Sequence, residues 1–398
     1  MSARRDLLPA LTPLRFPAAL IVFLAHAWGI LKGRGGAEWA PWVIHASIGV
    51  SLFFVLSGFI LTYNYLDDLR QPTRRSVWNF FVARWARTYP VHLLTLLLLL
   101  PVMYTALTSG RYGNPRQMAV VHVVLGQAFL PEDTLKANSF NPPSWSLSAE
   151  WFLYLCLPLL IPGLTTGSRT RRAAVLLLAL APWAVAVAGL AGALALPTWF
   201  SPYRYPPVRL ADFVAGVLLG LLWRKRHGVT VPVTTSVRRA TLAEVGAVLL
   251  LAVWVWGIAR ATADLEWARA SRWIGVYLPP CLLLVWVLAR GGGRVSRLLK
   301  SGPVAYLGEI SYAFYMLHWS VLITFAIYGP RYGTHRWGFG WRWAACAGIA
   351  FVLAVACYHL YEIPLRDRLR RKLSVRRPTA APEAPAVLPF PAADKRAA

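Results

Sequence analysis

Arg15-Phe-Pro-Ala-Ala-Leu-Ile-Val-Phe-Leu-Ala-His26-Ala-Trp28 is the first long apolar run of the chain, with one arginine at its start and one histidine inside it. The two residues are eleven positions apart, about three helical turns, so both side chains leave one helix face about 16 Å apart along its axis. Ionisable groups inside a bilayer are costly, which makes the pair a functional-site candidate. Taken alone, a hydrogen-bonded core histidine with an arginine reaching to the interface explains the pair as well.

The composition indicates a membrane protein. Of 398 residues, 57% are hydrophobic, and runs of about twenty apolar residues suffice to cross a hydrocarbon core. We expect an all-α integral membrane protein with about ten transmembrane helices. The stretch 117–131 is short and polar for a span, and we interpret it as interfacial or re-entrant. The expected spans are 14–31, 43–66, 89–108, 145–163, 173–195, 208–224, 242–260, 273–289, 305–328 and 342–361.

The net charge of +26 is unevenly distributed between alternate loops. With the N-terminus placed in the cytoplasm, the inside segments hold 28 Lys and Arg residues and the outside segments 13. This bias is the positive-inside pattern and predicts that both termini are cytoplasmic. Nucleic-acid binding is not expected, because no solvated basic face with interleaved aromatic residues exists.

Three parts follow along the chain. Residues 1–13 are expected to form a cytoplasmic N-terminal segment, 14–366 a ten-helix membrane domain, and 367–398 a basic, then Pro/Ala-rich cytoplasmic tail without folded structure. The basic part of that tail suits anionic lipid headgroups or serves as a topology anchor. A cleaved signal peptide is disfavoured, because Arg15 directly abuts the first apolar run.

Two polar motifs lie at the starts of expected spans, one before 89–108 and one at the beginning of 145–163. Arg84 and Arg87 are three residues apart on the cytoplasmic side, and such guanidinium pairs suit phosphates, although lipid headgroups suit them equally. Ser146, Glu150 and Tyr154 recur every fourth residue on one helix stripe. An intramembrane carboxylate needs a partner, and a histidine is an obvious one; the alternative is a glutamate near the helix start.

Three further motifs have structural alternatives. Arg209 and Asp212 have the spacing for an ion pair within one helix, which favours a structural role. His318 lies within an expected span and is either functional or a polar core residue. Glu362 at the inner end of the last span is suited to pair with an arginine or to reach the interface. The four cysteines, Cys156, Cys281, Cys346 and Cys357, are interpreted as core residues, and no metal site is expected.

Depth along the helices groups these residues. At about 1.5 Å per residue, His26, Glu150 and His318 are expected to share one level in the outer half of the membrane. Arg15, Arg84, Arg87 and Glu362 fall near the inner surface. Two polar layers result, an inner layer rich in arginine and an outer layer of histidine and glutamate.

Together these residues resemble the acyltransferase-3 family of integral-membrane O-acyltransferases over about residues 8–372. The resemblance rests on seven motifs in family order, with Asp212 where the family more often has glutamate. They are Arg15-x10-His26, Ser57-Gly58-Phe59, Arg84-x2-Arg87-x-Tyr-Pro, Trp145-Ser-Leu-Ser148-x-Glu150-x3-Tyr154, Arg209-Leu-x-Asp212, Ile310-Ser-Tyr-x-x-Tyr-x-x-His318 and Glu362-x-Pro364.

The resemblance implies transfer of an acyl group, usually acetyl, from cytoplasmic acyl-CoA to a hydroxyl of a sugar-containing acceptor. The acceptor is a cell-envelope glycan or a glycosylated antibiotic such as a macrolide, and the chain is similar to the stand-alone members. It implies a multi-pass protein of the bacterial plasma membrane, with acyl-CoA as co-substrate and no bound cofactor.

Within that resemblance, His26 is the expected general base, with Glu150 orienting it and His318 shaping the acceptor site or polarising the carbonyl. Arg15, Arg84 and Arg87 are the expected acyl-CoA ligands. Ser146 or Ser148 is a weaker candidate for an acyl relay. Supporting roles fall to Tyr154, Arg209, Asp212 and Glu362.

A transporter or exporter of a lipid or glycan is the alternative, because intramembrane His and Glu residues also form proton relays. The cytoplasmic arginine pair favours the acyltransferase. Trp145, Trp151, Trp199 and Trp319 suit sugar stacking or an interfacial aromatic belt equally. The acceptor, the acyl length and the side of acceptor modification stay open.

Overall fold

The protein is all-α in a computed structural model that describes residues 8–31, 46–108, 115–131, 140–190, 194, 197, 200–230, 236–261 and 275–375. The longer helices are α1 (Arg15–Leu31), α3 (Ser47–Leu69), α4 (Arg74–Thr108), α7 (Trp145–Thr165), α8 (Arg169–Leu190), α9 (Pro206–His227), α10 (Val237–Ala261), α12 (Leu278–Arg290), α14 (Gly302–Tyr328) and α15 (Phe339–Cys357). The shorter ones are η1 (Thr12–Leu14), α5 (Pro115–Val123), η3 (Gln127–Phe129), η4 (Pro142–Ser144), α13 (Arg294–Leu299), η5 (Gly329–Tyr332), η6 (Thr334–Arg336), η7 (Tyr358–Glu362) and α16 (Ile363–Leu373).

The prediction of an all-α integral membrane protein is confirmed. Within the described ranges, eight helical segments are long and apolar enough to cross a membrane. α12 is shorter, with 13 residues, and α4 is the other helix that falls on an expected span. The count of ten spans and the cytoplasmic termini stay predictions. Residues 376–398 of the expected tail lie outside the described residues, and α16 continues the helix across the boundary expected at 366.

α4 begins fifteen residues before the expected span because a reciprocal cap starts it at Arg74. The Thr73 hydroxyl accepts from the Ser76 backbone amide at 3.1 Å, and the Ser76 hydroxyl accepts from the Thr73 amide at 2.9 Å. This capping-box arrangement satisfies two amide donors that a helix start leaves without intrahelical partners. The helix that carries Arg84 and Arg87 therefore extends well beyond its apolar half.

The segment interpreted as interfacial or re-entrant reverses direction. α5 ends at Val123, and Leu125 has a φ of 58°, a left-handed conformation that is uncommon for residues other than glycine. The chain then enters η3 and packs against the start of α7. No helix long enough to span a membrane forms over residues 115–131.

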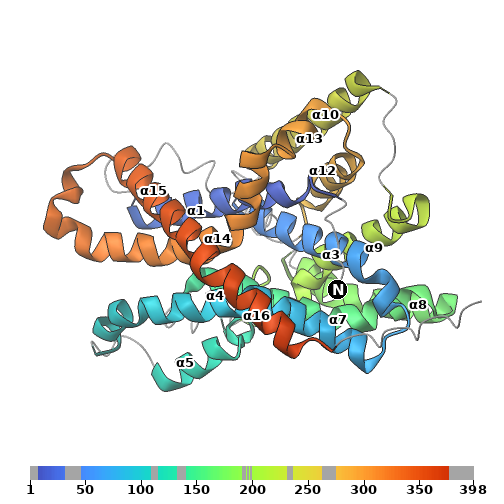
Figure 1. Cartoon of the computed structure of the whole chain (residues 1–398), viewed down its shortest axis with the longest axis horizontal. Helices are drawn as coiled ribbons and strands as arrows, with labels where there is room; N and C mark the ends of the chain where they lie inside the picture. Colours follow the sequence, from blue (N-terminus) through green and yellow to red (C-terminus); the bar gives the residue numbers. More distant parts are fainter. Residues whose placement is uncertain are drawn as a thin grey trace, which may run out of the picture.

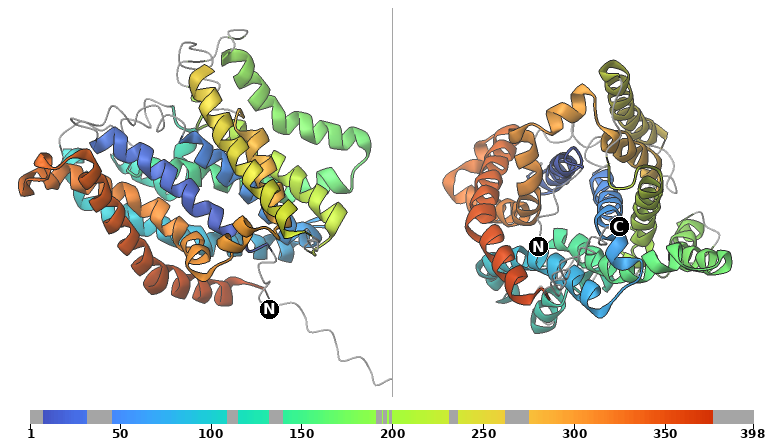
Figure 2. Two further views of the ribbon diagram at one scale, coloured as in Figure 1. Left: turned by 90° about the horizontal axis from the view of Figure 1, so that it is seen from above. Right: turned by 45° about the vertical axis from the view of Figure 1, so that its right-hand side comes forward.

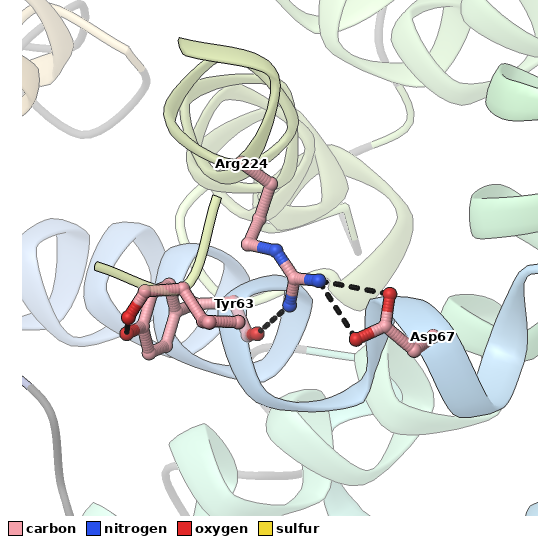
Figure 3. Close-up of polar contacts among 4 residues, drawn as sticks. Tyr63, Asp67 and Arg224 are labelled. Atoms are coloured by element: carbon pink, nitrogen blue, oxygen red, sulfur yellow. Dashed lines mark hydrogen bonds and ion pairs between the residues drawn. The ribbon is translucent and has the colours of Figure 1, made fainter. Parts of the chain in front are cut away.

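Close packing of α3 on α9 forms one wall of the bundle. A Cβ atom added at Gly58 would overlap the Phe213 carbonyl oxygen, and one added at Gly216 would overlap the Val55 carbonyl oxygen. Small residues let membrane helices approach closely, so both glycines are required by the contact. Figure 3 shows the far end of this pair, where Arg224 of α9 donates to both carboxylate oxygens of Asp67 at 2.8 and 2.7 Å and to the Tyr63 carbonyl at 2.7 Å.

The remaining helices surround this pair. α14 lies beside α1, with α15 packed against α14, and α16 packs on the first half of α4 (Figure 1). α7 packs against both α3 and α9, while α8 and α10 lie at the edge of the bundle (Figure 2). Leu177 and Leu178 of α8 are 72% and 77% exposed, as expected for side chains that face lipid. The buried interior between α1, α3, α4, α7 and α14 holds the candidate site.

Candidate active site

The two histidines predicted to share one level are in direct contact. His26 of α1 and His318 of α14 are joined by a 2.9 Å hydrogen bond between His26 Nδ1 and His318 Nε2. Their ring planes differ by 6°, so the rings meet edge to edge. The contact follows from the packing of α1 on α14. His318 is fully buried, whereas His26 is only partly buried.

A backbone carbonyl determines which nitrogen of each neutral ring carries the proton. His318 Nδ1 lies 2.5 Å from the Tyr315 carbonyl oxygen, which only accepts, so Nδ1 is the donor. In the neutral ring, His318 Nε2 then accepts, and His26 Nδ1 must donate to it. The lone pair of His26 therefore resides on Nε2, on the ring edge away from His318. This is the form of histidine that a general base requires.

A cavity of about 80 Å³ gathers the three predicted donor-binding arginines around the predicted glutamate. Arg15 comes from α1, Arg84 and Arg87 from α4, and Glu150 from α7. Three guanidinium groups face one carboxylate, so the cavity favours an anionic ligand. The other polar residues that line it are Ser57, Thr88, Ser146, Tyr154, Ser311, Tyr312 and Tyr315.

Glu150 lies with the arginines and not with the histidines, which corrects the expected outer layer. Its Oε1 accepts from the Ser57 hydroxyl at 3.2 Å and from the Tyr154 hydroxyl. Within the described residues no contact joins Glu150 to His26. The reason lies in the register of α7 and α14, where Ser146 meets Tyr315. Glu150 lies one turn beyond this contact on one side and His318 three residues beyond it on the other, about 10 Å apart along the helices.

Ser146 and Tyr315 lie between the cavity and the histidine pair. Their hydroxyl groups are 2.8 Å apart, and both donate to the Pro143 carbonyl, at 3.0 and 3.2 Å. Ser146, Glu150 and Tyr154 all line the cavity, so the predicted stripe of α7 faces one interior space. His26 and His318 do not line it; they begin one helical turn beyond Tyr315.

Ser148 points elsewhere. Its hydroxyl donates to the Leu125 carbonyl and accepts from the Ala128 amide at 3.2 Å. It is buried and anchors the segment after α5 on α7. Ser148 lies two residues from both Ser146 and Glu150, so its side chain points away from the helix stripe that they form. The structure therefore corrects the suggestion that Ser148 relays an acyl group.

Arg209 and Asp212 form the ion pair that their spacing predicts. Both are almost fully buried, and Arg209 also donates to the Ser51 hydroxyl of α3 at 2.9 Å. Neither lines the cavity. Together they tie α9 to α3, in keeping with the structural role that the sequence favours.

Glu362 forms no ion pair with an arginine among the described residues, and its burial also argues against the alternative in which it reaches the interface. It is 2% exposed, and neither carboxylate oxygen has a hydrogen-bond partner among the described residues. Arg87 and Arg366 lie within electrostatic range. The residue ends the π-helical turn η7, a local widening often found at functional sites.

Aromatic side chains surround the histidine end of the site. The Trp319 ring lies edge-on to His26 with 5.4 Å between centroids, and Trp145 packs against Tyr203 at 4.9 Å. Trp151 donates to the Thr88 hydroxyl at 3.2 Å, so it faces α4. Trp199 lies outside the described residues.

Sequence reasoning missed three site residues. Ser57 and Tyr315 stand in the motifs without a role, because only their tertiary contacts, with Glu150 and Ser146 respectively, reveal one. Arg204 precedes α9, and its charge is within range of His26. No spacing rule links it to His26, because the two are 178 positions apart. Within the described ranges, no group of three His, Cys, Asp or Glu side chains is placed to hold a metal.

Comparison with known proteins identifies the family of this chain. A model described as an acyltransferase domain, of the acyltransferase-3 type, matches residues 9–361. The chain belongs to the acyltransferase-3 family. It is an O-acyltransferase and a multi-pass membrane protein, as the resemblance implied.

Relatives of different length support the assignment. Acyltransferase MdmB of Streptomyces mycarofaciens is 30% identical over 95% of this chain and 96% of its own. The peptidoglycan O-acetyltransferase OatA of Listeria monocytogenes is 22% identical over 91% of this chain and 56% of its own. Nodulation protein 10 of Rhizobium leguminosarum is 27% identical over 44% of this chain and 49% of its own. This chain thus spans nearly all of MdmB but about half of OatA. No solved structure matches.

Proposed function

We propose that this acyltransferase-3 protein moves an acetyl group from cytoplasmic acetyl-CoA to a hydroxyl group of a sugar-containing acceptor in the bacterial plasma membrane. The observation that carries the proposal is the joint arrangement of the site. An arginine-lined cavity ends one helical turn from His318, and His318 is hydrogen-bonded to His26, whose free Nε2 suits a general base. A polyanionic thioester and a neutral alcohol are the reactants that such a pair of subsites serves.

The donor half rests on Arg15, Arg84 and Arg87. Guanidinium groups bind phosphate oxygens with paired hydrogen bonds, and CoA carries a 3′-phosphate and a diphosphate at one end of a long flexible arm. With the phosphates at the arginines, the arm extends along Glu150 and Ser57 toward Ser146 and Tyr315. The thioester then lies at the end of the cavity nearest His318.

The acceptor half rests on His26. Its Nε2 takes the proton from the attacking hydroxyl as the new C–O bond forms, and the C–S bond breaks to release the CoA thiolate. The proton passes from Nε2 to the thiolate, which restores the neutral ring. While His26 is protonated, its Nδ1–H still donates to His318 Nε2, so the cation keeps a partner. General-base assistance of this kind contributes about 10²–10⁴-fold to the rate.

The acceptor is drawn from what the relatives act on. OatA is named for peptidoglycan, and the family resemblance includes macrolides, so a peptidoglycan fragment and a glycosylated macrolide are the first acceptors to test. Trp319, beside His26, gives a flat apolar surface on which a sugar ring can stack.

The test uses purified protein in lipid nanodiscs, with acetyl-CoA and each acceptor, and follows product by mass spectrometry. His26→Ala is expected to lower kcat by about 10²–10⁴-fold with an unchanged KM for acetyl-CoA. Arg84→Gln is expected to raise that KM with little change in kcat. A His26→Ala protein that is folded and acetylates at the normal rate contradicts the role of His26. Substrate flux across vesicles without any acyl transfer would support the transporter instead.

A further inference from the structure

Helix α16 lies antiparallel along the first half of α4 (Figure 1). Two hydrogen bonds define the register: Tyr361 Oη donates to the Pro90 carbonyl at 3.3 Å, and Trp78 Nε1 donates to the Leu373 carbonyl at 2.8 Å. The contacts are twelve residues apart on α4 and twelve residues apart on the segment that runs from η7 through α16. Each residue along this segment therefore pairs in depth with one residue of α4.

The far end of α16 is also held in place. The Asn79 side chain donates to the Val375 carbonyl at 2.9 Å and accepts from the Val375 amide at 2.8 Å. These paired bonds replace the hydrogen bonds that the end of α16 would otherwise make with water. α16 is therefore fixed against α4 and is not a loose surface helix.

This register brings two more arginines to the α4 arginine pair. Arg366 and Arg370 are four residues apart on one face of α16. By the register they lie level with α4 positions 85 and 81, beside Arg84 and Arg87, so all four fall within about 9 Å along the helix. The charge of Arg370 is within electrostatic range of the other three.

The positive charge of this cluster exceeds the negative charge beside it. Asp367 contacts Arg366 at 3.2 Å, Glu362 is in range of Arg87 and Arg366, and Glu150 is in range of Arg84. Four guanidinium groups therefore face three carboxylates. Within the described residues, neither Arg84 nor Arg370 has a carboxylate within 4.0 Å. The Nε of Arg84 is buried without a hydrogen-bond partner. Like charges held this close repel one another, so the arrangement favours a ligand with several negative charges.

We propose that Arg366 and Arg370 of α16 complete a four-arginine site with Arg84 and Arg87, and that this site binds the phosphate groups at the head of the CoA-type donor. The inference rests on the proposed function. It revises the interpretation of the post-membrane basic segment as a lipid or topology anchor. Arg370 is partly buried against α4, whereas Arg368 and Arg371 are exposed on another face of α16. A headgroup contact would use the exposed face.

The experiment measures binding of free CoA, dephospho-CoA and pantetheine by calorimetry, with the full chain in neutral-lipid nanodiscs. Arg370→Gln and Arg366→Gln are each expected to weaken CoA binding by about tenfold, because a charged hydrogen bond is lost. Binding of pantetheine, which lacks phosphate, should be unchanged. Arg371→Gln removes the same charge from the exposed face of the same helix and should bind CoA normally. Arg370→Lys should recover part of the loss.

The outcomes separate the sources of phosphate. Equal CoA affinity in wild type, Arg370→Gln and Arg371→Gln overturns the inference. A second result would also overturn the inference. If Arg370→Gln and Arg371→Gln lose activity equally at every CoA-donor concentration, and only in nanodiscs with anionic lipid, the ligand is a lipid headgroup. Absence of CoA binding by the wild-type protein overturns the donor assignment of the proposed function itself. Each variant is first compared with wild type by thermal unfolding.

Discussion

The Tyr315 carbonyl oxygen determines which ring nitrogen carries the proton in both histidines of the site. It accepts from His318 Nδ1, which leaves His318 Nε2 to accept from His26 and frees the lone pair of His26 Nε2. His318 touches His26 and does not line the cavity, so we assign it a positioning role. The depth of the two residues along their helices predicted one shared level. The direct hydrogen bond could not be predicted, because it depends on how α1 and α14 rotate about their axes.

His318→Ala tests the positioning role. Without the acceptor at Nε2, the His26 proton is free to move to either nitrogen, so kcat should fall by about 10²-fold, at the low end of general-base effects. The KM for acetyl-CoA should not change. His318→Gln offers a carbonyl oxygen as acceptor and should recover part of kcat. Equal losses in the Ala and Gln variants, together with a lowered Tm, would indicate that His318 only fills space.

Glu150 shows where residue-scale reasoning stops. Its helix, its stripe and its place in a cavity follow from the four-residue spacing with Ser146 and Tyr154. Its partner does not follow, because Ser57 lies on a different helix, 93 positions earlier. The expectation of a His26 contact assumed that side chains at similar depth meet. The Ser146–Tyr315 contact shows that Glu150 lies about 10 Å from His318 along the helices.

At the scale of the helices, the α3–α9 contact holds the cavity wall that carries Ser57. Gly58 follows Ser57 directly, and its missing Cβ leaves room for the Phe213 carbonyl. Gly58→Ala should force the helices apart and destabilise the protein by about 1–3 kcal/mol. Thermal unfolding in detergent should show a lowered Tm. Since Ser57 moves with its helix, kcat should fall as well.

Gly246→Ala is the matched control for that prediction. Gly246 lies in α10, and an added Cβ there meets no atom within 4 Å. The change should be neutral or slightly stabilising, by up to about 1 kcal/mol, because alanine favours a helix more than glycine does. A Gly58→Ala protein with the Tm of wild type would show that α3 and α9 are not closely packed.

For the whole molecule, apolar runs predicted the membrane helices, and polar interruptions predicted all four charged residues that line the cavity, Arg15, Arg84, Arg87 and Glu150. What the sequence could not show is how α16 returns along α4. That register depends on single side-chain contacts, such as Trp78 with the Leu373 carbonyl. Composition alone left the basic residues of α16 as lipid contacts or a topology anchor, because charge near a membrane has the same pattern whether it binds headgroups or a soluble phosphate.

The direction of the whole molecule in the membrane is the remaining prediction, and it decides which reactant meets which end of the site. The distribution of 28 against 13 basic residues predicts that α9 ends in the cytoplasm and that α14 ends outside. Val229 follows α9 and Tyr332 follows α14, and they are 48% and 82% exposed. Single cysteines at these positions, in a chain whose four native cysteines are replaced, report the two sides. In intact cells, a membrane-impermeant maleimide should label Tyr332→Cys and not Val229→Cys, whereas both should react after lysis. This result would place the histidine end of the site nearer the outside and the arginines nearer cytoplasmic CoA. The reverse labelling would place the arginine cluster on the side that lacks CoA and would contradict the proposed path of the donor.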